Sequence, residues 1–386
     1  MAGTAAGVNR LAVALLAALL MAWPYIALDV HLPLGGWDLD APVADVLALL
    51  LVPWGAWRLV RGHRPDGAAG YLVLVGAGLA SAWIASDRVE ALHEWARRPV
   101  FYGLAYGLGV TALVAAIDAP IVRRALAAAV AVAALISLAT SAGRILAGDT
   151  LWYSAIAGLT NNHKTVAVAL APALAFLWGS PAPEAERRVL RGVVVLGVLA
   201  LLASASRTAW ISAGLAATWW ITWRGRAWAD RPWLVPTLAV LGFVAATYGP
   251  IATRSIPQID AMRSRYSIDK RSWALFASSP LVGASPGQSV RTELVRFPEY
   301  RVNGVDAHGV VQKVGAEYGL LGLAGYGAFV WATGRRCRRR HRPGDGTWPA
   351  FVALHLNLLL STETFTQTHW AMWALLVGST RDDRPE

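Results

Sequence analysis

The sequence contains very little cysteine and little charge. Its 386 residues include a single cysteine, Cys337, which excludes an internal disulfide framework and a cysteine-based metal cluster. Charged residues make up 15% of the chain and hydrophobic residues 56%. A soluble protein of this length could not bury so much apolar surface. The composition therefore excludes an ordinary soluble domain and indicates a membrane protein.

Patterns for metal and nucleotide chemistry are also missing. No two histidines have the H-x-x-x-H spacing and no cysteine–histidine cluster occurs, so neither a metal nor another cofactor is expected. There is no Walker or dinucleotide-binding motif. In a soluble chain the net charge of +11 would indicate nucleic acid. In a membrane protein we interpret it as loop charge that orients helices and contacts anionic lipids, with no nucleic-acid partner.

Apolar segments recur along the whole chain. A membrane-spanning helix needs roughly 20 mainly apolar residues. The first such segment resembles a signal-peptide core, but we interpret it as a retained helix because no convincing cleavage site follows. The sequence predicts an all-α integral membrane protein with about twelve transmembrane helices in a single polytopic domain, residues 1–386. The predicted spans are 9–28, 42–60, 70–86, 99–117, 122–146, 163–179, 189–205, 208–223, 232–250, 309–332, 347–361 and 367–380.

The distribution of arginine predicts the orientation of these spans. With the N-terminus in the cytoplasm, the short inner loops are dense in positive charge, as the positive-inside rule requires. The outer loops at 29–41 and 362–366 have no lysine or arginine. Both ends of the chain then lie inside, and residues 251–308 form a large outer loop between the ninth and tenth spans. The arginines of the inner loops are Arg58, Arg61, Arg64, Arg123, Arg124, Arg187, Arg188, Arg191, Arg224, Arg226, Arg231 and the cluster Arg335 to Arg342.

The large outer loop is polar and rich in arginine. Long loops cross the membrane with little regard to charge, so the topology permits this composition without explaining it. We interpret the arginines as ligands of an anion. Residues 264–276 predict an amphipathic helix on the membrane surface, with Arg265, Lys270, Arg271 and Trp273 as candidate site residues. The plainer alternative is a basic helix that only binds lipid head groups.

Further candidates lie at the outer edge of the predicted spans. Arg207 stands between two short spans; its planar fork suits a diphosphate, and the alternative is an interfacial arginine that snorkels. His308 stands beside Asp306 where the outer loop re-enters the membrane. It is a candidate general base or hydrogen-bond donor to a sugar, although a lone histidine at a helix start is usually structural. The other outer positive residues that we consider for substrate binding are Arg88, Arg97, Arg98 and Lys164.

Three stretches, taken in order, resemble one known family. They are Ser206-Arg-Thr-Ala-Trp210, the segment 271–283 with Trp273 and Pro280-Leu-Val-Gly283, and the segment 306–322 with His308 and Glu317-Tyr-Gly-Leu-Leu-Gly322. The chain resembles the O-antigen ligase family, integral membrane glycosyltransferases that also include O-antigen polymerases. Two departures are Asp306 and Gly309, which stand where the family has asparagines beside the histidine. The sequence leaves open whether Arg271 or Arg265 corresponds to the second arginine of the family, after Arg207.

The resemblance implies a GT-C-like fold in the bacterial inner membrane with a site facing the periplasm. A glycan linked to undecaprenyl diphosphate would be transferred to a sugar hydroxyl without a metal ion. Arg207 with Arg271 or Arg265 would hold the diphosphate, and His308 would activate the acceptor hydroxyl. Lys164, Lys270, Asp306, Trp273, Arg88, Arg97 and Arg98 would contribute to substrate binding.

Four hypotheses from two function classes stay open at this stage. The leading hypothesis is a ligase that attaches the glycan to the lipid A–core. A polymerase that joins lipid-linked repeat units is the alternative within the class, and a protein O-oligosaccharyltransferase is a third option. From a different class, a lipid or glycan transporter would place ionisable residues near the middle of the membrane. The predicted spans are nearly free of charge, which favours an enzyme with a site at one face.

Overall fold

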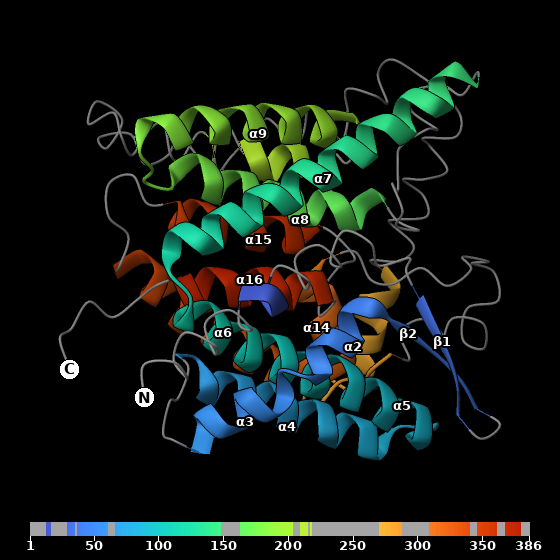
Figure 1. Ribbon diagram of the computed structural model, residues 1–386. Helices are drawn as coiled ribbons and strands as arrows, with labels where there is room; N and C mark the ends of the chain where they lie inside the picture. Colours follow the sequence, from blue (N-terminus) through green and yellow to red (C-terminus); the bar gives the residue numbers. More distant parts are fainter. Residues whose placement is uncertain are drawn as a thin grey trace, which may run out of the picture.

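The computed structural model describes a bundle of long, roughly antiparallel helices (Figure 1). The described residues are 13–16, 29–34, 37–60, 66–147, 163–203, 209–214, 217, 270–287, 309–339, 346–360 and 367–379. The helices are α2 (Val43–Leu49), α3 (Val52–Val60), α4 (Ala68–Ile84), α5 (Arg88–Trp95), η2 (Ala96–Val110), α6 (Thr111–Ala116), α7 (Ala119–Leu146), α8 (His163–Gly179), α9 (Glu184–Ala203), α14 (Val310–Arg339), α15 (Thr347–Leu360) and α16 (Gln367–Ser379).

Helix α16 lies at the centre of the bundle. In Figure 1 it separates α7, α8, α9 and α15 on one side from α3, α4, α6 and α14 on the other. Every residue from Trp370 to Val377 is buried, on all faces of the helix. A helix that is apolar all round is stable only inside a larger structure, so α16 forms the core around which the other helices pack.

Helices α4 and α14 cross at two glycines. A Cβ atom at Gly70 would lie 2.5 Å from the backbone nitrogen of Phe329, and one at Gly325 would lie 2.6 Å from that of Leu74. Small residues at such a crossing allow the two backbones to approach closely, which is how helices associate where the surroundings are already apolar. This contact fixes α14 against α4 and thereby positions the residues near the start of α14.

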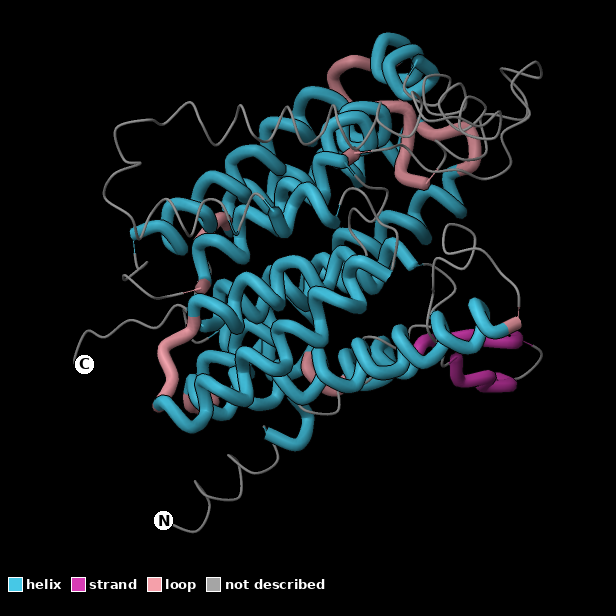
Figure 2. Tube along the Cα trace, turned by 90° about the horizontal axis from the view of Figure 1, so that it is seen from above, coloured by secondary structure: helices cyan, strands magenta, loops and turns pink. Residues whose placement is uncertain are grey.

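The two ends of the bundle differ in what they carry. In Figure 1 the start of α7 lies at one end of the bundle and the hairpin β1–β2 at the other, and Figure 2 also shows the two strands at one end of the helices. Helix α5 and the segment 270–287 also lie at the hairpin end (Figure 1). The described segments that the sequence analysis assigned to the outer side, residues 29–41, α5 and 270–287, therefore lie at the same end of the bundle.

The helical character predicted from the sequence is confirmed, whereas the count of twelve spans is not. Among the described residues, two helices are long and apolar enough to cross a membrane, Arg88–Ala116 and Ala119–Gly143, and several shorter apolar helices accompany them. The predicted span at 232–250 lies wholly outside the described residues, and so do most of the spans at 9–28 and 208–223.

Three details differ from the predicted elements. The span at 42–60 is divided into α2 and α3, with a turn at Leu50 and Leu51. Residues 29–42 contain a two-stranded antiparallel hairpin, β1 (Asp29–Leu34) and β2 (Trp37–Pro42), in a chain predicted to be all-α. The predicted loop before residue 99 is helical from Arg88, because Asp87 accepts a hydrogen bond from the Glu90 N–H and caps the helix.

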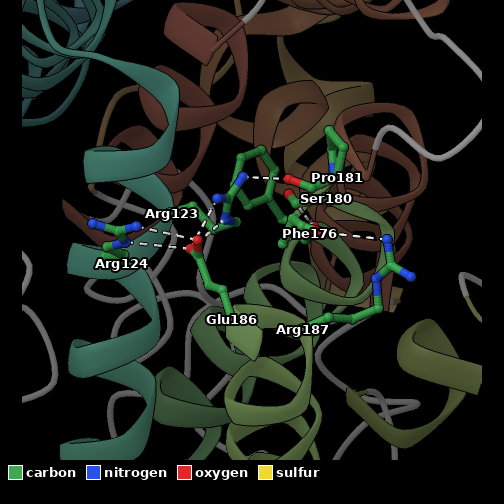
Figure 3. Close-up of polar contacts among 8 residues, drawn as sticks. Arg123, Arg124, Phe176, Ser180, Pro181, Glu186 and Arg187 are labelled. Carbon is green, nitrogen blue, oxygen red and sulfur yellow. Dashed lines mark hydrogen bonds and ion pairs between the residues drawn. The ribbon is translucent and has the colours of Figure 1, made fainter. Parts of the chain in front are cut away.

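The end of the bundle at which α7 begins is fastened by an ion-pair cluster between α7 and α9 (Figure 3). Arg123, which is 6% exposed, donates from Nε and Nη2 to Oε1 of Glu186 at 3.0 and 2.8 Å. It also donates to the carbonyl of Pro181. The exposed Arg124 adds a bond to Oε2 of Glu186 at 3.3 Å. Two loops that the arginine distribution assigned to one side of the membrane therefore meet through Glu186.

This cluster predicts a pH-dependent contribution to stability. Burial raises the pKa of the Glu186 carboxyl, but hydrogen bonds from Arg124 and Arg123 and their charges outweigh it, so the pKa lies below its ordinary 4.5. A depressed pKa stabilises the fold above the unfolded-state value, and this contribution is lost as the pH falls through the folded-state value. We expect Glu186→Gln to cost about 1–3 kcal/mol at pH 7, because Arg123 loses its buried partner.

The measurement is thermal unfolding of the purified protein between pH 7 and pH 3. The difference between wild type and Glu186→Gln should shrink as the pH falls below about 4.5. Glu184→Gln is the matched control, because Glu184 pairs with Arg187 on the surface, where both side chains are about half exposed. Equal losses in the two variants at pH 7 would contradict the role assigned to Glu186.

Candidate functional site

The segment 270–287 carries one of the two competing arginines. Residues 270–278 form a helix, and residues 279–287 continue in turns. The helix ends before Pro280, because the residue that precedes a proline is disfavoured in helical conformation. The predicted amphipathic helix is therefore present from residue 270 onward, and its first part lies outside the described residues.

Neighbouring residues of this helix have different surroundings. Arg271 is only 5% exposed, whereas Lys270 is exposed and Trp273 is 50% exposed. Leu275, one turn after Arg271, is 2% exposed, so these two side chains share the buried face of the helix. Of the candidates on this helix, Arg271 is directed into the protein, while Lys270 and Trp273 lie at its surface.

The turn that follows the helix is bonded into a break in α14. Gly319 has φ 65° and ψ −161°, a conformation that interrupts α14 between its first turns and its long remainder. Three backbone hydrogen bonds join the turn to α14 on both sides of the break: Leu320 N–H to the Pro280 carbonyl (2.8 Å), Leu321 N–H to the Leu281 carbonyl (3.1 Å) and Ala284 N–H to the Ala316 carbonyl (2.7 Å). Two motifs that the sequence analysis treated separately thus form one interlocked unit.

Two glycines make this unit possible. A Cβ atom at Gly319 would lie 2.4 Å from the carbonyl carbon of Leu281. Gly283 also has a positive φ of 78°, and a Cβ atom there would lie 2.3 Å from the carbonyl carbon of Glu317. Because any larger residue would collide with backbone atoms, the unit requires glycine at both positions.

The first turns of α14 bury two charged residues that the sequence analysis did not select as site residues. Lys313 and Glu317 are each 1% exposed, and their spacing places them on one face of the helix. The carbonyl of Glu317 accepts a hydrogen bond from Ser81 Oγ of α4 at 2.7 Å. The signal was visible in the sequence: a lysine and a glutamate four residues apart within a predicted span are expensive to bury and commonly functional.

Gly309 marks the point at which the chain enters α14. It has φ 109°, and a Cβ atom at this position would lie 2.5 Å from the Leu359 carbonyl oxygen near the end of α15. Both the conformation and the contact favour glycine, which gives a physical reason for the departure from asparagine at this position.

The three arginines near α5 have partners of their own. Arg98 pairs with Glu94 at 2.6 Å, and Arg97 lies 3.8 Å from the same carboxylate. Arg97 also donates to the hydroxyl of Tyr102 at 3.2 Å. The guanidinium carbon of Arg88 lies 5.8 Å from the centre of the Trp83 ring. These contacts organise the surface around α5.

Glu94 connects α5 with the interlocked unit. A Cβ atom at Gly287 would lie 2.6 Å from Cγ of Glu94, so the end of segment 270–287 rests on this side chain. The candidates near α5 and the unit that holds Arg271 therefore share one end of the bundle.

The remaining candidates cannot be placed from the described residues. Arg207, Arg265, Asp306 and His308 lie outside them, and so does the side chain of Lys164, whose backbone belongs to the first turn of α8. Among the described residues no group of three or more histidine, cysteine, aspartate or glutamate side chains could hold a metal ion.

The fold and its buried charged residues define the class of protein. A helical bundle with long apolar helices, a central apolar helix and a buried charged unit at one end is that of a helical membrane protein. The model of the O-antigen ligase family matches residues 192–327, about a third of the chain, and this part of the chain is similar to that family, as its motifs predict. No curated protein matches the chain.

The matched region includes the interlocked unit and all four candidates for direct chemistry, Arg207, Arg265, Arg271 and His308, of which only Arg271 belongs to the described residues. It begins before Arg207 and ends after the glycine-rich part of α14, and it does not include Arg88, Arg97, Arg98 or Lys164. The match supports an enzyme with the general activity of O-antigen ligases and polymerases, which are glycosyltransferase-like.

Proposed function

We propose that this protein is an O-antigen ligase of the bacterial inner membrane. It transfers a glycan from undecaprenyl diphosphate to a sugar hydroxyl of the lipid A–core at the periplasmic face. The new bond joins the acceptor oxygen to the anomeric carbon, and the bond between that carbon and the diphosphate oxygen breaks. Undecaprenyl diphosphate leaves with the bonding electrons, and no metal ion takes part.

The proposed roles of the residues follow from this chemistry. Arg271 and Arg207 bind the diphosphate through their planar forks and stabilise the negative charge that grows on the leaving group. His308 accepts the proton of the acceptor hydroxyl as the new bond forms. Arg265 stays the alternative second arginine. Lys164, Asp306 and the arginines near α5 contribute to binding of the glycan or the lipid head groups.

The burial of Arg271 is the observation that carries this proposal. A merely lipid-binding helix would leave its arginine at the surface as it leaves Lys270, whereas Arg271 is 5% exposed and shares the buried face of the helix with Leu275. The interlock with α14 holds Arg271 on a defined scaffold. The family match over 192–327 connects this scaffold with glycan transfer.

The test is transfer by variants at the two other predicted residues. Arg207→Ala and His308→Ala should each lower glycan transfer about 100-fold or more, with normal insertion into the membrane. Transfer is measured with purified protein, a lipid-diphosphate-linked glycan and the core acceptor. A wild-type transfer rate in either variant would contradict the role assigned to that residue.

Ligase and polymerase are separated by the glycan that accumulates in a deletion strain. Long chains on the carrier lipid with an unmodified core identify a ligase. A core that carries a single repeat unit identifies a polymerase, which would join lipid-linked repeat units with the same leaving group.

The transporter alternative predicts a different place for the buried charge. Transporters bind substrates near the middle of the membrane, between repeats. Lys313 and Glu317 instead belong to the first turns of the 30-residue helix α14, beside the segment that carries Arg271. Charge gathered at one end of the bundle favours an enzyme whose site faces one compartment.

A further inference from the structure

The guanidinium group of Arg97 has hydrogen-bonding positions available to a ligand. Its side chain is 46% exposed. Its Nε donates to the Tyr102 hydroxyl at 3.2 Å, and its Nη1 lies 3.8 Å from Oε1 of Glu94, beyond hydrogen-bond distance. Within the described part of the chain, neither terminal nitrogen of Arg97 makes a hydrogen bond. The N–H groups of the terminal nitrogens are therefore available to a ligand.

A chain of hydrogen bonds holds Arg97 in place. The Tyr102 hydroxyl, which accepts from Arg97, donates to Oδ2 of Asp45 in the first turn of α2 at 3.2 Å. Tyr106, four residues further along η2, donates to Oδ1 of the same carboxylate at 3.1 Å. Both tyrosines are buried, and their rings meet edge to face with centroids 5.8 Å apart. The network orients the guanidinium before any ligand binds.

Arg187 shows how a comparable surface arginine uses its donors. It belongs to α9 at the other end of the bundle, is 50% exposed and pairs with Glu184 three residues earlier, as Arg97 does with Glu94. Both of its terminal nitrogens donate to the protein, Nη1 to Glu184 at 3.2 Å and Nη2 to the Ala182 carbonyl at 3.0 Å. Arg97 instead uses Nε as its anchor and keeps both terminal nitrogens for other partners.

The groups around Arg97 suit a sugar hydroxyl better than a phosphate. The carboxylates of Glu94 and Asp45 belong to the same network and would repel an anion. A hydroxyl accepts a hydrogen bond from a guanidinium and donates one to a carboxylate. The 3.8 Å between Nη1 of Arg97 and Oε1 of Glu94 leaves room for one hydroxyl to contact both.

We propose that Arg97 and Glu94 bind hydroxyl groups of a sugar, and that Tyr102 and Asp45 are positioning residues for Arg97. This inference rests on the proposed function and deepens it, because it names the chemical group that an arginine near α5 recognises. Glu94 also contacts the end of segment 270–287, so this sugar subsite adjoins the interlocked unit.

The experiment measures binding, without transfer, by full-length protein in detergent. The three probes are the lipid A–core glycolipid, the undecaprenyl-diphosphate-linked glycan, and undecaprenyl diphosphate without a sugar. Arg97→Gln should raise the Kd of at least one sugar-bearing lipid about tenfold and leave that of undecaprenyl diphosphate within about twofold of wild type. An increase for the glycolipid identifies an acceptor sugar, and an increase for the linked glycan identifies a transferred sugar. Arg187→Gln is the matched control and should change none of the three Kd values.

Two further variants separate a positioned guanidinium from a simple charge. Tyr102→Phe should raise the same Kd about threefold, because Arg97 loses its anchor and keeps its donors. Arg97→Lys should bind the sugar as weakly as Arg97→Gln, because an ammonium does not reproduce the planar fork. Both Arg97 variants should keep the wild-type melting temperature, since the side chain is half exposed.

Three results would overturn the proposal. Wild-type binding by Arg97→Lys would show that only the charge acts. An unchanged Kd in Tyr102→Phe would remove the positioning role. Equal increases in Arg97→Gln for the linked glycan and for undecaprenyl diphosphate would show that the ligand is a phosphate.

Failure of this inference and failure of the proposed function give different results. Sugar binding that depends on Arg97, in a protein without glycan transfer, supports the inference and overturns the proposed function. Glycan transfer with Kd values that are unchanged in Arg97→Gln overturns the inference and leaves the proposed function in place.

Discussion

Gly319→Ala is expected to destabilise the protein by about 2–5 kcal/mol. It is also expected to abolish activity, because the site no longer folds. Two costs add at this position. An alanine at φ 65° is strained, and its Cβ atom would lie 2.4 Å from the carbonyl carbon of Leu281 and 2.6 Å from the backbone nitrogen of Gly283. The neighbouring atoms are backbone on both sides, so no side-chain rotation can relieve the contact. The interlocking turn has to separate from α14.

Gly327 provides the matched control in the same helix. A Cβ atom there meets nothing within 4 Å. Gly327→Ala should therefore leave stability within about 1 kcal/mol of wild type, in the stabilising direction that helix propensity predicts. Thermal unfolding of the two variants in one detergent makes the comparison. Similar melting temperatures for Gly319→Ala and Gly327→Ala would show that the break in α14 does not hold the segment 270–287.

Much of the helical architecture could be predicted because it depends on local pattern. The starts and ends of α8, α15 and α16 agree with the predicted spans within a few residues, since apolar length and loop polarity set them. The selection of Arg271 as a candidate also came from sequence, through its place on an amphipathic segment. Its burial could not be predicted, because a helical pattern alone leaves open which of Lys270 and Arg271 faces the protein.

The interlocked unit depends on contacts between distant segments, which no local pattern contains. Pro280-Leu-Val-Gly283 reads as a turn, and Gly319 reads as a glycine within an apolar span. Only the backbone hydrogen bonds between the two segments show that the turn at 280–283 fits into the break at Gly319. The same limit applies near α5. Arg97 and Arg98 are predicted to contribute to substrate binding, and the structure adds that their spacing from Glu94 forms helix ion pairs.

Arg271→Gln is expected to lower glycan transfer about 100-fold or more, the usual effect of removing a group that stabilises developing negative charge. Glutamine keeps a polar side chain of moderate length and removes the charge and the planar fork. Arg188→Gln is the matched control, because it removes the same charge from a surface arginine of α9, 79% exposed, outside the candidate site. Its transfer rate should stay within about twofold of wild type, as for a surface charge that touches no reacting group.

Arg271→Lys distinguishes the two ways in which Arg271 can act. If its charge alone stabilised the buried unit, lysine would restore both the melting temperature and the transfer rate. If the fork binds two diphosphate oxygens at once, lysine restores the melting temperature and leaves transfer about tenfold or more below wild type, because a point charge cannot reproduce the bidentate contact. Wild-type transfer by Arg271→Gln would instead indicate that Arg265 is the second arginine that binds the diphosphate. The buried guanidinium of Arg271 would then serve only the packing of segment 270–287 on α14.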